Sequence, residues 1–235
     1  MKLGWLVGLL LAAAGAGGGF ALVVHAAETA IPAMEEPRHR MKLENEYVRV
    51  LDIEIPPGDQ TLFHTHDLNY AYLMVNDALL RNEVMGQPGS VELKITAGLV
   101  GYYRANAGAY THRFTNIGSE PFRAIGIELL RAGPSPDVTA PLPDSSGYVA
   151  VLDNERVRAY RLVLEPGQST SMVTVPGPGV RVAATAGKLE QQSAGTEPVG
   201  LQLAPGRFEF RARPVAQSLK NVGDARVEIY EFELK

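Results

Sequence analysis

Residues 45–60 read NEYVRVLDIEIPPGDQ and residues 154–169 read NERVRAYRLVLEPGQS, so this chain of 235 residues contains an internal repeat. At the offset of 109 that aligns them, the opening asparagine and the closing Pro-Gly pair coincide. THRFTNIGSEPFRAIGIEL at 111–129 likewise matches AQSLKNVGDARVEIYEFEL at 216–234, at an offset of 105. Such a repeat indicates one structural unit that occurs twice. We predict that the second copy lost four residues around the loop-like stretch GQPGS at 86–90.

Both copies consist of short runs in which apolar and polar residues alternate. One run begins at Val48 and stops at Pro56-Pro57-Gly58, and VELKITAG at 91–98 and FRAIGIELL at 122–130 have the same character. Successive side chains of a strand point to opposite faces, so this pattern is typical of strands separated by turns. Apart from a turn or two near residues 34–41, no sustained helical period follows the N-terminal region. We predict an all-β fold of two barrels or sandwiches in tandem.

The first residues have the pattern of a secretory signal peptide. No charge occurs after Lys2 through Val24, and Val24 and Ala26 stand where signal peptidase reads small side chains. The alternative is an uncleaved membrane anchor, because about 20 apolar residues can span a bilayer. Glycines in the middle of the segment weaken it as a helix. We predict cleavage near Ala26 and a periplasmic or secreted protein, or a membrane-anchored one if the segment stays.

Charge and composition exclude some partners and sites. The formal net charge of -4 leaves no basic surface for phosphate backbones, so we expect no nucleic-acid partner. Cysteine is absent, which excludes disulfides and thiolate metal sites.

Three of the five histidines form a metal-binding pattern. His64 and His66 are two residues apart, so on a strand they point to the same face. His112 comes from a distant strand of the same copy, and a closed barrel can bring it to the same interior. His25 and His39 lie in the signal segment and in the polar lead-in. We predict that His64, His66 and His112 share one cation.

The second copy supports a joint role for the three histidines. At the two offsets of the repeat, their positions hold Val173, Val175 and Gln217. All three histidines are therefore missing together, as expected for ligands of one ion.

These residues resemble the cupin family. Its first motif is G-x5-H-x-H-x3,4-E-x6-G and its second is G-x5-P-x-G-x2-H-x3-N. The matching residues are Gly58, His64 and His66 in the first motif and Gly101, His112 and Asn116 in the second. The resemblance is strong over residues 43–131 and extends weakly, through the repeat, to 147–235.

The chain departs from the family pattern at two points. The glutamate position of the first motif falls at Tyr70 or Ala71, so the carboxylate ligand is missing. The proline and glycine of the second motif are Ala107 and Ala109, which suggests a different turn before His112.

The resemblance implies a double-stranded β-helix, or jelly-roll, barrel for each copy. The predicted organisation is a signal peptide at 1–26, a lead-in at 27–42, a metal-binding cupin domain at 43–131, a Pro-rich linker at 132–146 and a degenerate cupin domain at 147–235. We expect the degenerate domain to cover the first barrel and to complete an apolar interface with it.

The predicted site has the character of a catalytic metal centre. Three imidazoles leave coordination positions open, which is typical of catalytic rather than structural sites. Imidazole binds Fe, Mn, Zn, Ni and Cu alike, so the identity of the divalent ion stays open. Tyr70 shares strand parity with His64 and His66, and we predict it as a catalytic proton donor, with packing of the barrel interior as its alternative role.

Three functions remain open, because cupins host many reactions. The first is a dioxygenase-like oxidoreductase that acts on a small oxygenated molecule. The second is a non-oxidative metal enzyme, namely an isomerase, hydrolase or lyase. The third is a protein that binds metal or a small ligand without turnover. We expect a small-molecule ligand in each case, and a homodimer is compatible with all three.

Overall fold

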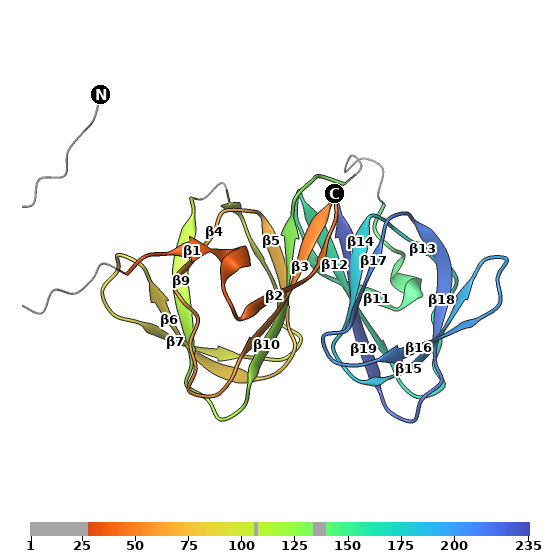
Figure 1. The fold of residues 1–235 in the computed structure, drawn as a ribbon. Coiled ribbons are helices and arrows are strands. Elements are labelled where there is room, and N and C mark those ends of the chain that lie inside the picture. Colours follow the sequence, from red (N-terminus) through yellow and green to blue (C-terminus); the bar gives the residue numbers. More distant parts are fainter. Residues whose placement is uncertain (1–27, 106–107, 134–139) are drawn as a thin grey trace, which may run out of the picture.

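The computed structural model describes residues 28–105, 108–133 and 140–235. The predicted signal segment, residues 1–26, lies outside the described residues. The described chain forms two β-barrels side by side, one from each copy of the repeat (Figure 1). The prediction of two tandem jelly-roll barrels is confirmed.

The first barrel consists of two five-stranded sheets, in the orders β1-β4-β9-β6-β7 and β2-β3-β10-β5-β8. Its elements are β1 (Ile31–Pro32), η1 (Ala33–Glu35), β2 (His39–Glu44), β3 (Val48–Ile55), β4 (His64–His66), β5 (Tyr70–Met74), β6 (Ala78–Val84), β7 (Val91–Ile95), β8 (Val100–Tyr103), β9 (Tyr110–Asn116) and β10 (Phe122–Leu129).

The second barrel repeats this topology with a five-stranded sheet, β11-β12-β19-β14-β17, and a four-stranded sheet, β13-β18-β15-β16. Its elements are η4 (Asp144–Ser146), β11 (Tyr148–Asp153), β12 (Val157–Leu164), β13 (Val173–Val175), β14 (Gly179–Ala183), β15 (Gly187–Ser193), β16 (Val199–Leu203), β17 (Phe208–Arg211), β18 (Val215–Asn221) and β19 (Val227–Leu234).

The lead-in contributes to the first barrel. β1 pairs with β4 in parallel, and β2 pairs with β3. The expected turn of helix is the short 3-10 element η1, and a turn at 36–38 leads from it into β2. The domain boundary that we set at residue 43 therefore cuts through β2.

The loss of four residues from the second copy is divided between two loops. Ala78 of β6 corresponds to Gly187, an offset of 109, whereas Val91 of β7 corresponds to Val199, an offset of 108. The offset reaches 105 only at β9 and β18. One residue is thus missing after β15 and three after β17, so the prediction that placed all four near GQPGS was wrong. The Gly-Pro-Gly composition of 86–90 suggested that loop, whereas most of the difference lies between β8 and β9, where six residues correspond to three between β17 and β18.

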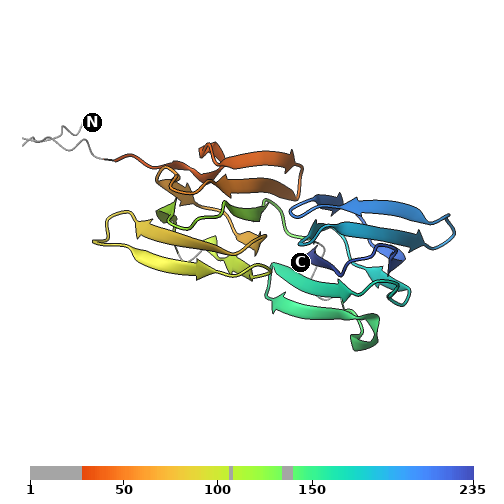
Figure 2. The same ribbon diagram turned by 90° about the horizontal axis from the view of Figure 1, so that it is seen from below.

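The barrels pack against each other through the sheets that contain β3 and β12 (Figure 2). One apolar cluster spans both copies. Its buried members include Val50, Ile127, Ala159, Val182 and Phe232. This cluster is the apolar interface that we expected between the copies, and it buries one face of each sheet.

Each barrel also inserts a side chain into a turn of the other. Arg123 donates to the carbonyl of Pro205 at 2.7 Å, and the Tyr230 hydroxyl donates to the carbonyl of Gly98 at 3.0 Å. A Cβ atom on Gly206 would lie 2.8 Å from the Arg123 guanidinium, so glycine makes room for this approach. The two contacts occupy corresponding turns, and the interface has approximate two-fold character.

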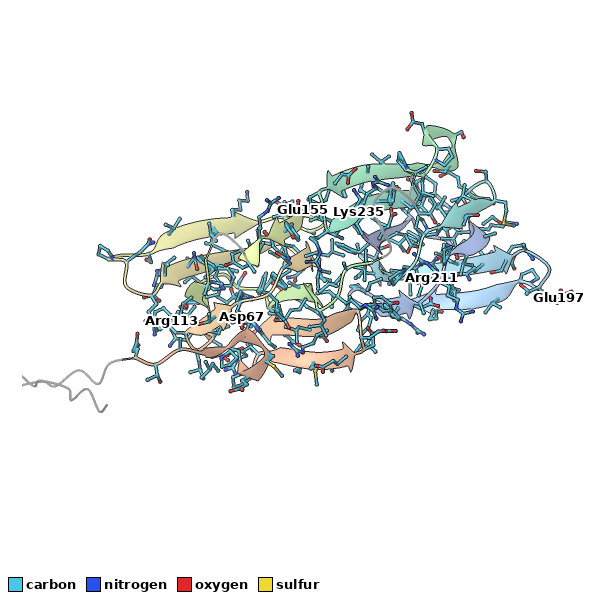
Figure 3. The ribbon with its side chains drawn as sticks, turned by 90° about the horizontal axis from the view of Figure 1, so that it is seen from above. Asp67, Arg113, Glu155, Glu197, Arg211 and Lys235 are labelled. Atoms are coloured by element: carbon cyan, nitrogen blue, oxygen red, sulfur yellow. The ribbon has the colours of Figure 1, made fainter. Side chains whose placement is uncertain are left out.

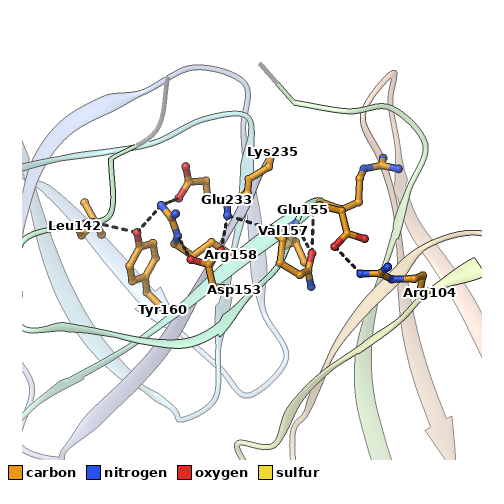
Figure 4. Close-up of polar contacts among 11 residues, drawn as sticks. Arg104, Leu142, Asp153, Glu155, Val157, Arg158, Tyr160, Glu233 and Lys235 are labelled. Atoms are coloured by element: carbon orange, nitrogen blue, oxygen red, sulfur yellow. Dashed lines mark hydrogen bonds and ion pairs between the residues drawn. The ribbon is translucent and has the colours of Figure 1, made fainter. Parts of the chain in front are cut away.

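An ion pair joins the rims of the two barrels. Arg104 at the end of β8 donates to Glu155 at 2.6 Å (Figure 4). Figure 3 shows Glu155 and Lys235 where the two barrels meet, with Arg113 on the first barrel and Arg211 on the second. Arg104 is therefore engaged at the interface.

Among the residues that the structure describes, no helix has the length and apolar content to span a membrane.

Candidate metal centre

The pairing of β4 with β9 brings the three predicted histidines together. His64 lies directly opposite His112 in the antiparallel register, and His66 shares the face of His64. Exposed fractions of 1%, 6% and 4% show that His64, His66 and His112 are all buried. One nitrogen of each lies within 4.8 Å of one nitrogen of the others. The cluster can therefore hold one metal ion.

Hydrogen bonds orient two of the three rings. His64 Nδ1 lies 2.9 Å from the Leu62 carbonyl, and His112 Nδ1 lies 3.0 Å from Asn82 Oδ1. These oxygens can only accept, so each Nδ1 carries the proton and each Nε2 keeps its lone pair. His66 Nδ1 is buried and has no hydrogen-bond partner among the described residues. Converging nitrogens with free lone pairs fit a divalent cation.

Burial keeps these imidazoles neutral. It lowers the pKa of His66 to about 3 and that of His112 to about 2, with a further decrease from the neighbouring histidines. Burial also lowers the pKa of His64. Neutral imidazole is the form that binds metal, so the cluster needs no deprotonation at neutral pH.

Asn82 on β6 supports the cluster, and we did not predict it. Its amide accepts from His112 and donates to the Tyr110 hydroxyl at 2.8 Å. The Tyr110 ring in turn stacks on His112, with 4.5 Å between the ring centroids. The contact depends on the pairing of β6 with β9, which sequence spacing does not reveal.

His39 is a fourth buried histidine beside the cluster, although we placed it in the polar lead-in. Its ring centroid is 4.6 Å from that of His64, and its Nδ1 donates to the Ala33 carbonyl at 2.7 Å. Burial lowers its pKa to about 3, and His64 lowers it further. In the structure His39 corresponds to Tyr148 of the second barrel, and both begin strands with the same burial pattern.

The cluster lies in the wall of a cavity of about 520 Å³. The cavity is lined by tyrosines and by apolar side chains. These include Tyr70, Tyr72, Tyr103, Tyr110, Ile53, Met74, Phe114 and Phe122. This volume is in the range of sites for small organic molecules.

Tyr70 lies at the cluster as predicted, but not through strand parity. β4 ends at His66, and Tyr70 begins β5 in the other sheet of the barrel. Its ring stacks on that of His66 with 5.0 Å between centroids. Gly126 on the neighbouring strand leaves the space, because a Cβ there would come within 2.5 Å of the Tyr70 ring. Burial raises the pKa of Tyr70, so its hydroxyl stays protonated.

Asn116, the last residue of the family pattern, shapes a turn. Its amide donates to the carbonyls of Ile55 and Glu120, both at 2.8 Å, and accepts from the Gly118 amide. The side chain is fully buried. It holds the end of β9, the strand that carries His112.

No protein-family model and no curated protein matches the sequence. Solved structures do match. Oxalate decarboxylase of Bacillus subtilis, a protein with Mn(II) centres, is 12% identical over 80% of this chain and 69% of its own, with a TM-score of 0.57. AerE from Microcystis aeruginosa is 14% identical over 85% of this chain and 98% of its own, with a TM-score of 0.53.

Salicylate 1,2-dioxygenase from Pseudoaminobacter salicylatoxidans, solved with gentisate, is 12% identical over 80% of this chain and 68% of its own, with a TM-score of 0.54. At these identities the likeness shows the fold. The chain therefore has the fold of two-cupin proteins. The three-histidine cluster lies in its first barrel alone, among the residues that the structure describes.

Proposed function

We propose that the protein is a metal-dependent enzyme, dioxygenase-like in type, that acts on a small oxygenated organic molecule in the first barrel. His64, His66 and His112 would hold the ion. The observation that carries the proposal is the position of this neutral histidine cluster in the wall of a cavity of about 520 Å³. A structural metal site would not need a cavity of that size beside it.

A divalent ion bound to the three histidines supplies a Lewis acid and, in its redox-active forms, an electron donor. The protein's own residues do the rest. Asn82 and the Leu62 carbonyl hold the orientation of the His112 and His64 rings. The protonated Tyr70 hydroxyl is a proton donor for an oxygen atom of the substrate.

The lining indicates the substrate class. Apolar and aromatic walls favour a flat, largely apolar molecule, and oxygen atoms on it would face the histidines. The rings of Tyr70 and Tyr110, which stack on histidine rings at interplanar angles of 30° and 27°, offer stacking surfaces at this end of the cavity.

The test begins with the metal content of natively purified protein. We expect about one divalent ion per chain, and oxygen consumption by the iron(II) form with a panel of enols and catechols. Tyr70→Phe should lower kcat by about 100-fold, the scale of a lost general acid, while the metal content stays unchanged. A loaded protein that consumes no oxygen with any compound would contradict the oxidative proposal.

One observation favours a second candidate, a non-oxidative metal enzyme such as an isomerase or lyase. Tyr70 is a buried, protonated phenol next to His66, and proton transfer needs such a group without any redox change. Turnover by the zinc form under anaerobic conditions would identify this candidate. Metal binding with neither activity would leave a non-catalytic binding protein.

Export is a further part of the proposal, supported by the sequence of residues 1–26 alone. The mass of the protein recovered from a periplasmic fraction tests it. We expect a chain that begins after Ala26, and a full-length mass in the membrane fraction would indicate the anchored alternative.

A further inference from the structure

The interior of the second barrel holds charges where the first barrel holds aromatic rings. Arg181 and Arg211 occupy the positions of Tyr72 and Tyr103 in the repeat. Arg181 Nε donates to Glu231 at 2.7 Å, and Arg211 Nη1 donates to the same carboxylate at 3.0 Å.

This buried trio has a net positive charge. The side chains of Arg181, Arg211 and Glu231 are 5%, 10% and 1% exposed. Burial opposes the ionisation of Glu231, but the two guanidiniums outweigh it and hold its pKa below the usual value. One carboxylate therefore balances two cations, and an uncompensated buried charge is costly. Glu209 lies 3.8 Å from Arg181 but is 61% exposed, so it compensates only weakly.

Two buried hydrogen-bond donors beside this trio make no hydrogen bond of good geometry within the described chain. Gln217 stands where the first barrel has His112, and its Nε2 is buried without a hydrogen-bond partner among the described residues. The hydroxyl of Tyr148, which stands where the first barrel has His39, lies beside the Gln217 side chain, but no hydrogen bond of good geometry joins the two. Burial raises the pKa of Tyr148, and the charge of Glu231 adds to this, so the hydroxyl remains a donor. Buried donors of this kind normally have an acceptor.

A cavity of about 250 Å³ gives access to Arg181. Its wall contains Arg207, an exposed guanidinium with no ion pair among the described residues, and Glu209. Leu201 and Phe208 supply apolar wall. The volume is several times the roughly 30 Å³ that one water molecule occupies in the liquid, so a small molecule fits.

We propose that the second barrel binds a small monocarboxylate anion, with its carboxylate on the Arg181 guanidinium and its short apolar part against Leu201 and Phe208. One negative charge matches the single excess positive charge of the buried trio. Guanidinium and carboxylate match in geometry, because both are planar and can form two parallel hydrogen bonds. The site does not depend on the metal centre of the first barrel.

The test is calorimetric titration of the mature two-barrel protein with sodium acetate at pH 7. Sodium chloride at equal ionic strength is the control. We expect saturable binding of acetate. Arg207→Gln should weaken it by about two- to fivefold, the scale of one exposed charge interaction, and Glu209→Gln should tighten it by a similar factor. Opposite shifts from two exposed positions report charge, and neither variant replaces a residue of the buried trio.

Further measurements serve as controls. Arg81→Gln, an exposed change on the first barrel, should have no effect, and His64→Ala should leave acetate binding intact. Inorganic phosphate is expected to bind more weakly than acetate. Absence of saturable acetate binding, tighter binding of phosphate, or shifts of the same sign in the Arg207 and Glu209 variants would overturn the proposal.

Discussion

Tyr70 in the first barrel lies over Gly126, whereas the second barrel has Gly179 and Glu231 at the same two positions. In the first copy the large side chain is on β5 and the glycine is on β10. In the second copy the glycine is on β14 and the large side chain is on β19. The pairing of β5 with β10 and that of β14 with β19 have the same register, so the exchange leaves the backbone pattern unchanged. The interior of this barrel can thus be refilled without altering its topology.

The turns that follow β9 and β18 have the same hydrogen bonds in both copies. Asn116 and Asn221 each donate to two backbone carbonyls and accept from a glycine amide two residues on. Corresponding distances agree within 0.1 Å. The framework is therefore retained, while the residues that face the interior have diverged into a histidine-lined cavity and an ion-pair network.

Removal of one metal-binding histidine should produce the largest difference between the two barrels. His64→Ala should abolish stoichiometric metal binding and any metal-dependent turnover, because two imidazoles hold a divalent ion much less tightly than three. Val173→Ala, at the matching position of the second barrel, should leave both unchanged. Elemental analysis of the two purified variants checks this, and equal metal content in both would contradict the assignment.

Acidification should destabilise the first barrel more than the second, and this is the next largest expected effect. In metal-free protein the pKa values of His39 and His66 are about 3 and that of His112 is about 2, against roughly 6.5 in an unfolded chain. Below pH 6.5 the unfolded state binds more protons, so stability falls as the pH falls towards the folded values. At pH 5 the free energy of unfolding is lower by about 2 kcal/mol per histidine than at neutral pH.

Hydrogen exchange measured for each barrel between pH 7 and pH 5 tests this expectation. The amides of the first barrel should lose protection before those of the second. Equal loss in both barrels would show that the histidines are not the cause.

The retained turns allow a matched test of stability. Asn116→Ala and Asn221→Ala should each lower the free energy of unfolding by about 2–3 kcal/mol, because each removes three hydrogen bonds and leaves buried backbone groups unpaired. Urea unfolding of the two variants measures the losses. A clear difference between the two losses of unfolding free energy would mean that the two turns do not have equivalent roles.

The smallest expected effect concerns the support of the metal ligand. Asn82→Leu should weaken metal binding by about tenfold, since His112 loses the acceptor that orients its ring. Gln191→Leu, at the corresponding position of the second barrel, should leave metal affinity unchanged. Competition with a metal chelator provides the measurement. The same metal affinity in both variants would show that Asn82 does not support the metal ligand.

Much of the fold could be predicted from the sequence, because strand alternation and the internal repeat are local patterns. The placement of the missing residues could not, since the β8–β9 loop lacks the Gly-Pro chemistry that drew attention to 86–90. The grouping of His64, His66 and His112 was also predictable, because strand parity and the joint loss of all three need no coordinates.

By itself, the sequence determined the number of barrels, their all-β character and the three histidines that come together in one of them. The tertiary structure alone decided which other groups meet at these sites. Asn82 and His39 reach the histidines through strand pairing and through the packing of the lead-in, at long sequence separation. The charges of Arg181 and Glu231 form one buried group for the same reason: a closed barrel brings side chains from distant strands into one interior, and spacing along the chain does not record that distance.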